Sequence, residues 1–127
     1  MKSSDLNQLL KGTSSGGYLQ SIINEEVLSY ESLLKKKGSS IPLIFHEDED
    51  IMLDAMSVNK LLQEVITGKL SNVHLAYICD CLTLGERVDF ANEKLKDLIF
   101  ELADPEINGG YKSNPELKEM LDDYNGR

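Results

Sequence analysis

The chain has 127 residues, a net charge of −9 and an apolar content of 41%. This length predicts one domain whose core needs no disulfide or metal to hold it together. The excess of acids disfavours nucleic acid and anionic membranes as direct ligands, and no apolar run reaches the roughly 18–20 residues that cross a bilayer. The first residues lead into no apolar signal segment, so a cytoplasmic location is expected.

Apolar residues recur every three or four positions along most of the chain, which is the period of an amphipathic helix. A short N-terminal helix is expected, followed by a hinge of small residues at Gly12–Gly17, so residues 1–17 are predicted to form a flexible segment. The next helix should run from Tyr18 to Lys37, because three lysines suit its negative C-terminal end and Gly38 stops it.

The rest of the chain predicts four more helices. The first should begin at an N-cap at Ser57 and stop at Gly68, and the second should start after Ser71 and end near Gly85. The third is marked by the apolar stripe Leu95, Leu98, Ile99 and Leu102 and closes before Pro105, and the last has its cap and first turn at Asn114-Pro115. The helix between Ser71 and Gly85 is apolar on most sides, so it should lie at the centre of the molecule. The sequence therefore predicts an all-α, single-domain bundle of five to six helices.

A long connection, residues 39–56, separates the two halves and holds the densest run of acids. This run comprises Glu47, Asp48, Glu49 and Asp50. Ile41–Phe45 has the composition of a short strand, but a single strand has no sheet to join, so the stretch is expected to be an acidic surface connection. Its acids are interpreted either as a solvated loop or as a patch for a basic protein surface.

Each catalytic or cofactor motif lacks a necessary residue. The glycines of Gly12–Gly17 have phosphate-loop spacing, but Tyr18 follows where that motif needs a lysine. Cys79 and Cys81 point in directions about 200° apart on a helix and are expected to be buried apolar residues. His74 is expected to be a hydrogen-bonded structural histidine, and no ligand spacing fits a metal site. The sequence predicts no cofactor, no metal and no enzyme.

The helix before Pro105 carries the sharpest candidate for an interface. Its acids recur at i, i+4, i+8 and i+11 and form an acidic ridge opposite the apolar stripe: Glu93, Asp97, Glu101 and Asp104. Phe100 projects beside this ridge, where it would anchor a partner that the charge attracts. The alternative is that the last helix covers Phe100 and that the acids are an ordinary solvated surface.

Three segments resemble one family of proteins. They are LLQEVITGKLS at Leu61–Ser71, LAYI at Leu75–Ile78 and FANEKLKDLIFELADPEING at Phe90–Gly109. These segments are similar to small bacterial immunity proteins that are encoded beside contact-dependent or polymorphic toxins. The clearest part is Asp104–Gly109, although a helix stop and an Asn-Gly turn also serve as a purely structural connection. The resemblance covers roughly residues 57–125 and implies a helical protein that neutralises a cognate toxin by tight, non-catalytic binding.

We therefore predict a cytoplasmic protein whose acidic surface binds a basic toxin domain. The contacted surface of the toxin could be the active site of a nuclease. The expected contact residues are Glu93, Asp97, Phe100, Glu101 and Asp104, with Glu47, Asp48, Glu49 and Asp50 as a second contact. The main alternative is a helical adaptor or regulatory module that binds through an apolar groove. A third interpretation is a small hydrolase that uses His74.

Overall fold

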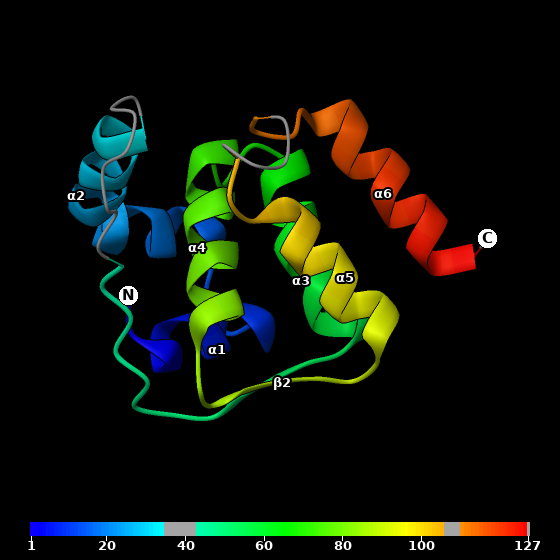
Figure 1. The fold of residues 1–127 in the computed structure, drawn as a ribbon, viewed down its shortest axis with the longest axis horizontal. Coiled ribbons are helices and arrows are strands. Elements are labelled where there is room, and N and C mark those ends of the chain that lie inside the picture. Colours follow the sequence, from blue (N-terminus) through cyan, green and yellow to red (C-terminus); the bar gives the residue numbers. More distant parts are fainter. Residues whose placement is uncertain (35–42, 106–109, 127) are drawn as a thin grey trace.

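The computed structural model describes residues 1–34, 43–105 and 110–126, which form six helices and one two-stranded sheet (Figure 1). The helices are α1 (Ser3–Leu10), α2 (Gly16–Leu34), α3 (Ala55–Ile66), α4 (Asn72–Leu84), α5 (Glu93–Leu102) and α6 (Asn114–Gly126). In Figure 1, α4 stands in the middle, with α2 on one side and α5 and α6 on the other. The predicted helical class and number of helices are confirmed.

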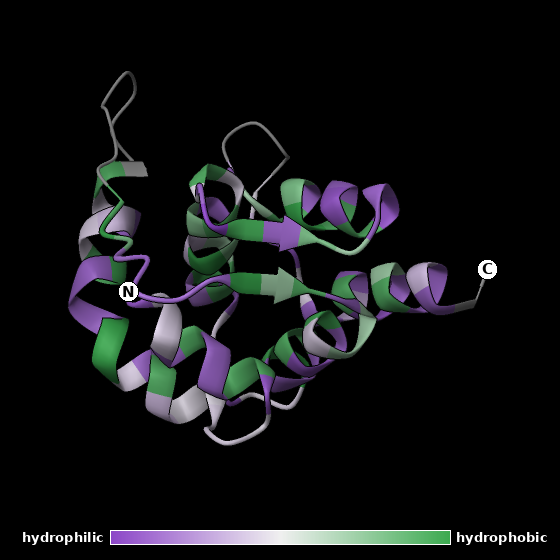
Figure 2. Cartoon of the chain, turned by 90° about the horizontal axis from the view of Figure 1, so that it is seen from below, coloured by the Kyte–Doolittle hydropathy of each residue, from purple (hydrophilic) through white to green (hydrophobic). Residues whose placement is uncertain are grey.

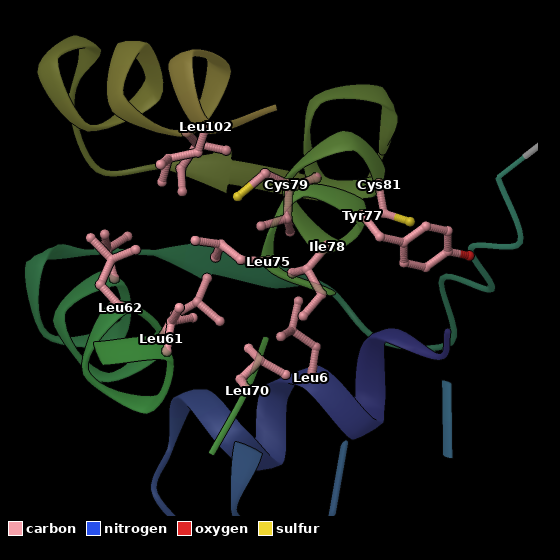
Figure 3. Close-up of a cluster of buried hydrophobic side chains, with 14 of the residues drawn as sticks. Leu6, Leu61, Leu62, Leu70, Leu75, Tyr77, Ile78, Cys79, Cys81 and Leu102 are labelled. Atoms are coloured by element: carbon pink, nitrogen blue, oxygen red, sulfur yellow. The ribbon is translucent and has the colours of Figure 1, made fainter. Parts of the chain in front are cut away.

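The helix α4 forms the centre of the hydrophobic core, as its composition predicts. Ser71 caps its first turn by accepting a hydrogen bond from the N–H of His74, and the helix ends at Gly85. Figure 3 shows its buried side chains among those of α1, α3 and the end of α5. Buried residues shown there include Leu6, Leu61, Leu62, Leu75, Tyr77, Ile78, Cys79, Cys81 and Leu102.

The sheet was not predicted. It pairs β1 (Ile51–Leu53) with β2 (Val88–Phe90) in parallel, and Figure 2 shows the two strands side by side. Ile51 and Leu53 are buried, while Met52 between them is 57% exposed. The prediction of a surface connection over residues 39–56 is therefore wrong from Ile51 onward, because a strand partner lies far along the chain, after α4. Leu43–Phe45 forms no strand, although His46 makes an isolated parallel bridge with Lys2.

The start of α3 and the start of α6 both differ from the predicted caps. Asp54, not Ser57, is the N-cap of α3: its carboxylate accepts from the N–H of Ser57, whose hydroxyl oxygen accepts from the N–H of Asp54. At α6, Ser113 precedes the helix and its N–H donates to Glu116 Oε1 at 3.0 Å. The expected cap, Asn114, is instead the first residue of this helix.

The N-terminal segment is packed, so the prediction of a flexible segment at residues 1–17 is wrong. Leu6 and Leu9 are fully buried, and α1 contacts both α2 and α3. At the predicted hinge, the N–H of Gly16 donates to Glu64 Oε1 at 2.7 Å, and a Cβ at Gly16 would lie only 3.0 Å from the Cβ of Glu64. The small residues allow α2 to begin against α3.

Parts of three predictions fall outside the described residues. One is the end of the first long helix at Lys35–Lys37 and Gly38, since α2 is described as far as Leu34. The second is the start of the predicted connection, residues 39–42. The third is Glu106–Gly109, within the segment that carries the family resemblance most clearly.

Candidate functional site

The helix α5 has the two faces that its sequence predicts. Asn92 caps it by accepting a hydrogen bond from the N–H of Leu95 at 2.9 Å. Its apolar stripe is buried, and comprises Leu95, Leu98, Ile99 and Leu102. This packing fixes the rotation of the helix, so the opposite face is held toward solvent.

Three carboxylates occupy that exposed face. Glu93, Asp97 and Glu101 are all exposed, and none of these side chains forms a hydrogen bond or an ion pair with another described residue. Lys94 does not neutralise them, because its ammonium group donates to the main-chain carbonyls of Asp123 and Tyr124 at 3.3 Å and 3.2 Å. We call Glu93, Asp97 and Glu101 the α5 acids.

Asp104 does not extend this face as predicted. It follows the end of α5, with φ of +47°, and its N–H donates to Asp80 Oδ1 at 2.6 Å. The chain leaves the helical path after Leu102, because Ala103 already has an extended backbone with ψ of 167°, and the acidic ridge stops at Glu101. Helical spacing was therefore extrapolated one step too far, past the end of the helix.

Phe100 is 43% exposed, so α6 does not fully cover it. Its ring centroid lies 6.4 Å from that of Phe90 in β2, and the ammonium group of Lys96 lies 5.8 Å from its centroid. The two aromatic rings border an open groove of about 510 Å³ between the end of α4, β2 and α5. We call it the β2 groove. Its lining includes Gly85, Val88, Phe90, Glu93, Lys96 and Phe100.

The acidic loop, Glu47 to Asp50, has a structural use that its composition did not indicate. Asp48 accepts hydrogen bonds from the N–H of Ser4 at 2.9 Å and from the hydroxyls of Ser3 and Ser4 at 3.0 Å and 2.7 Å. These bonds, chiefly from Ser4, hold the pKa of Asp48 well below its usual range. Glu49 accepts from the amide of Asn7 at 3.0 Å. The loop thus holds the start of α1.

The other two loop acids hold the segment that leads into β2. Glu47 accepts from the N–H groups of Glu86 and Arg87 at 3.1 Å and 2.8 Å. Asp50 pairs with the Nε of Arg87 at 2.6 Å. All four loop carboxylates are therefore hydrogen bonded within the chain, whereas the α5 acids form no hydrogen bond with a described residue.

Asp80 forms a polar contact that the sequence reasoning missed. It is an aspartate within the apolar run of α4, and this was the only signal for it. The hydroxyl of Tyr30 donates to one carboxylate oxygen, and the N–H of Asp104 donates to the other. Burial raises the pKa of Asp80, although both hydrogen bonds oppose that shift. The contact joins α2, α4 and the end of α5.

The candidate nucleophiles and base are buried. His74 is 7% exposed; one ring nitrogen contacts the hydroxyl of Ser71, and Nε2 has no partner among the described residues. Burial lowers the pKa of His74, while the charge of Glu31 opposes this. Cys79 and Cys81 have no exposed surface, and burial raises the pKa of both thiols, so they are poor nucleophiles. Their predicted place in the core is confirmed.

Comparisons with family models, curated proteins and solved structures gave no match to this chain. Among the described residues, no group of three His, Cys, Asp or Glu side chains is placed to hold a metal ion. In the same part of the chain, no helix combines the length and the apolar character that a membrane span requires.

Proposed function

We propose that this protein binds a basic protein partner through the α5 acids and Phe100, without catalysing a reaction. The observation that carries the proposal is the exposed, unpaired state of the α5 acids on a helix whose other face is fixed in the core. Lys94, the nearest cation in the sequence to Glu93, donates its hydrogen bonds to main-chain carbonyls at the end of α6. A partner's lysines and arginines would supply the missing countercharge.

Phe100 supports the same face as an interface. An aromatic ring that lies beside charged residues and is only half covered by its own chain is typical of an interface residue that a partner buries on binding. Because Phe100 already contacts Phe90, its ring is positioned before binding and loses little freedom when a partner covers it. Charge would speed the encounter, and burial of the ring would slow dissociation.

The partner we propose is a toxin domain, with this protein as its immunity protein in the cytoplasm. The support is the resemblance of residues 57–125 to that family, together with the acidic face. The active site of a nuclease is one basic surface of this kind, since it must attract phosphate.

The test is expression of the C-terminal domain of the neighbouring upstream reading frame, alone and together with this protein. We expect the domain to stop growth alone and to be harmless in the presence of wild-type protein. An Asp97→Lys/Glu101→Lys variant that keeps its helical circular dichroism should no longer protect. Toxicity that wild-type protein leaves unchanged would contradict the proposed pairing.

One observation favours the alternative function, an adaptor that binds through an apolar groove. A depression between α1, β1 and the start of α3 is bordered by Met52 and Met56, which are 57% and 83% exposed. Methionines suit surfaces that adapt to several partners. Binding that Met56→Glu abolishes and Asp97→Lys leaves intact would favour the adaptor.

A further inference from the structure

The outer edge of β2 has main-chain groups that form no hydrogen bond with the described part of the chain. The N–H of Ile51 donates to the carbonyl of Arg87 and the N–H of Ala91 donates to that of Leu53, both at 2.9 Å. In a parallel ladder this register turns the N–H and C=O groups of Val88 and Phe90 away from β1. Among the described residues, none forms a hydrogen bond with these outward groups.

The edge is open to a partner because it borders the β2 groove. Val88 and Phe90 both line the groove, with α4 ending at one side and α5 beginning at the other. Their side chains are partly buried on the face that also holds Ile51 and Leu53. An added strand would therefore meet apolar side chains on one face of the sheet and Asp89 on the other.

The charge around this edge is acidic. Glu86, Asp89 and Glu93 are exposed beside it. Arg87 pairs with Asp50 and donates to the carbonyl of Glu47, so its charge is largely neutralised within the chain. Lys96, which lies near Phe100, is the cation that remains in the groove. The surplus of acids favours a basic segment as the occupant.

We propose that an extended, basic segment of the protein partner adds to β2 as a third strand of the sheet. Its main chain would bond to the outward groups of Val88 and Phe90, as in other cases of strand addition. The side chains of the segment would alternate between the two faces of the sheet. Those on one face would be apolar and pack against Phe90 and Phe100, and those on the other would be basic and lie near Asp89. This inference rests on the proposed function and adds the shape and pattern of the partner's contact.

The test is hydrogen–deuterium exchange of the full chain, free and bound to the purified C-terminal domain of the neighbouring upstream reading frame. We expect the amides of Val88 and Phe90 to exchange at least about tenfold more slowly in the complex. The amide of Met52, which faces the opposite edge of the sheet, is the matched control and should not change. Binding without added protection at Val88 and Phe90 would overturn the inference while leaving the proposed function intact.

Two other outcomes would count against it. Protection that grows with the concentration of the free protein would show that a second copy takes the edge. Absence of any binding would contradict the proposed function, and this inference with it.

A variant provides an independent measurement. Val88→Pro removes an N–H that β1 does not use, so the fold should tolerate it, and binding should weaken by about tenfold or more. Met52→Pro makes the same change on the opposite edge and should leave affinity unchanged. Equal affinities for both variants would overturn the inference, and if Val88→Pro fails to fold, the exchange experiment on the wild-type complex decides.

Discussion

Asp48 and Asp97 are both exposed aspartates, yet their surroundings differ. Asp48 accepts three hydrogen bonds from Ser3 and Ser4 at the first turn of α1, where a negative charge also suits the helix dipole. Asp97 contacts no described hydrogen-bond donor from its own chain. In the sequence, both residues are simply acids in a charged stretch. The difference is hidden there because Ser3 and Ser4, which donate hydrogen bonds to Asp48, lie far from it along the chain. Of the two carboxylates, that of Asp97 is the one without a hydrogen bond to a described residue.

This difference predicts that replacing Asp48 lowers stability and that replacing Asp97 does not. Because the folded state lowers the pKa of Asp48, the stability it contributes is present above its unfolded pKa of about 3.9 and is lost as pH falls through the folded pKa. Urea unfolding of Asp48→Asn should therefore show lower stability than wild type at neutral pH, with a gap that closes in acid. Asp97→Asn is the control and should be no less stable than wild type at neutral pH, because it removes no hydrogen bond to a described residue and relieves repulsion from Glu93 and Glu101. A gap for Asp48→Asn that stays constant with pH would contradict the assigned contacts.

At the scale of elements, α5 combines a buried structural face and the proposed binding face in ten residues. Its apolar stripe and its cap at Asn92 were predictable, because helical periodicity and capping are local properties of the sequence. The end of the helix at Leu102 was not, since helical spacing alone does not say at which residue the chain leaves the helix. The cap of α3 was missed for a related reason: Asp54 and Ser57 are both good cap residues, and the choice depends on β1 ending at Leu53.

Neighbouring residues on α5 should separate stability from binding. Ile99 is fully buried, so Ile99→Ala should cost about 2–5 kcal/mol of unfolding free energy. Phe100→Ala removes a half-exposed ring and should cost less than about 1 kcal/mol, while weakening partner binding by more than about tenfold. Chemical denaturation and titration calorimetry measure the two effects. A Phe100→Ala variant that is strongly destabilised but binds normally would place this ring in the core and not in the interface.

At the scale of the whole molecule, the helices follow from local patterns and the sheet does not. Each strand has three residues, which is too few for a period-two pattern to stand out. The two strands that pair are also separated along the chain by α3 and α4. The β2 groove, which depends on that sheet, could not be predicted for the same reason. The net charge could be calculated from composition. Which acids are hydrogen bonded, as in the acidic loop, and which are not, as in the α5 acids, could be learned only from three-dimensional contacts.

The most direct measurement of the central claim compares two charge-reversal variants, Asp97→Lys on α5 and Glu25→Lys on α2. The quantity measured is their affinity for the proposed partner, the C-terminal domain of the neighbouring upstream reading frame. Both residues are exposed helix positions, and Figure 1 shows α2 and α5 on opposite sides of α4. Because net charge changes equally in the two variants, a difference between them reports the face and not the total charge.

We predict that Asp97→Lys weakens binding by at least about tenfold and reduces its dependence on salt, while Glu25→Lys binds like wild type. Titration calorimetry at low and high salt measures both quantities. Equal affinities for the two variants would contradict binding through the α5 acids.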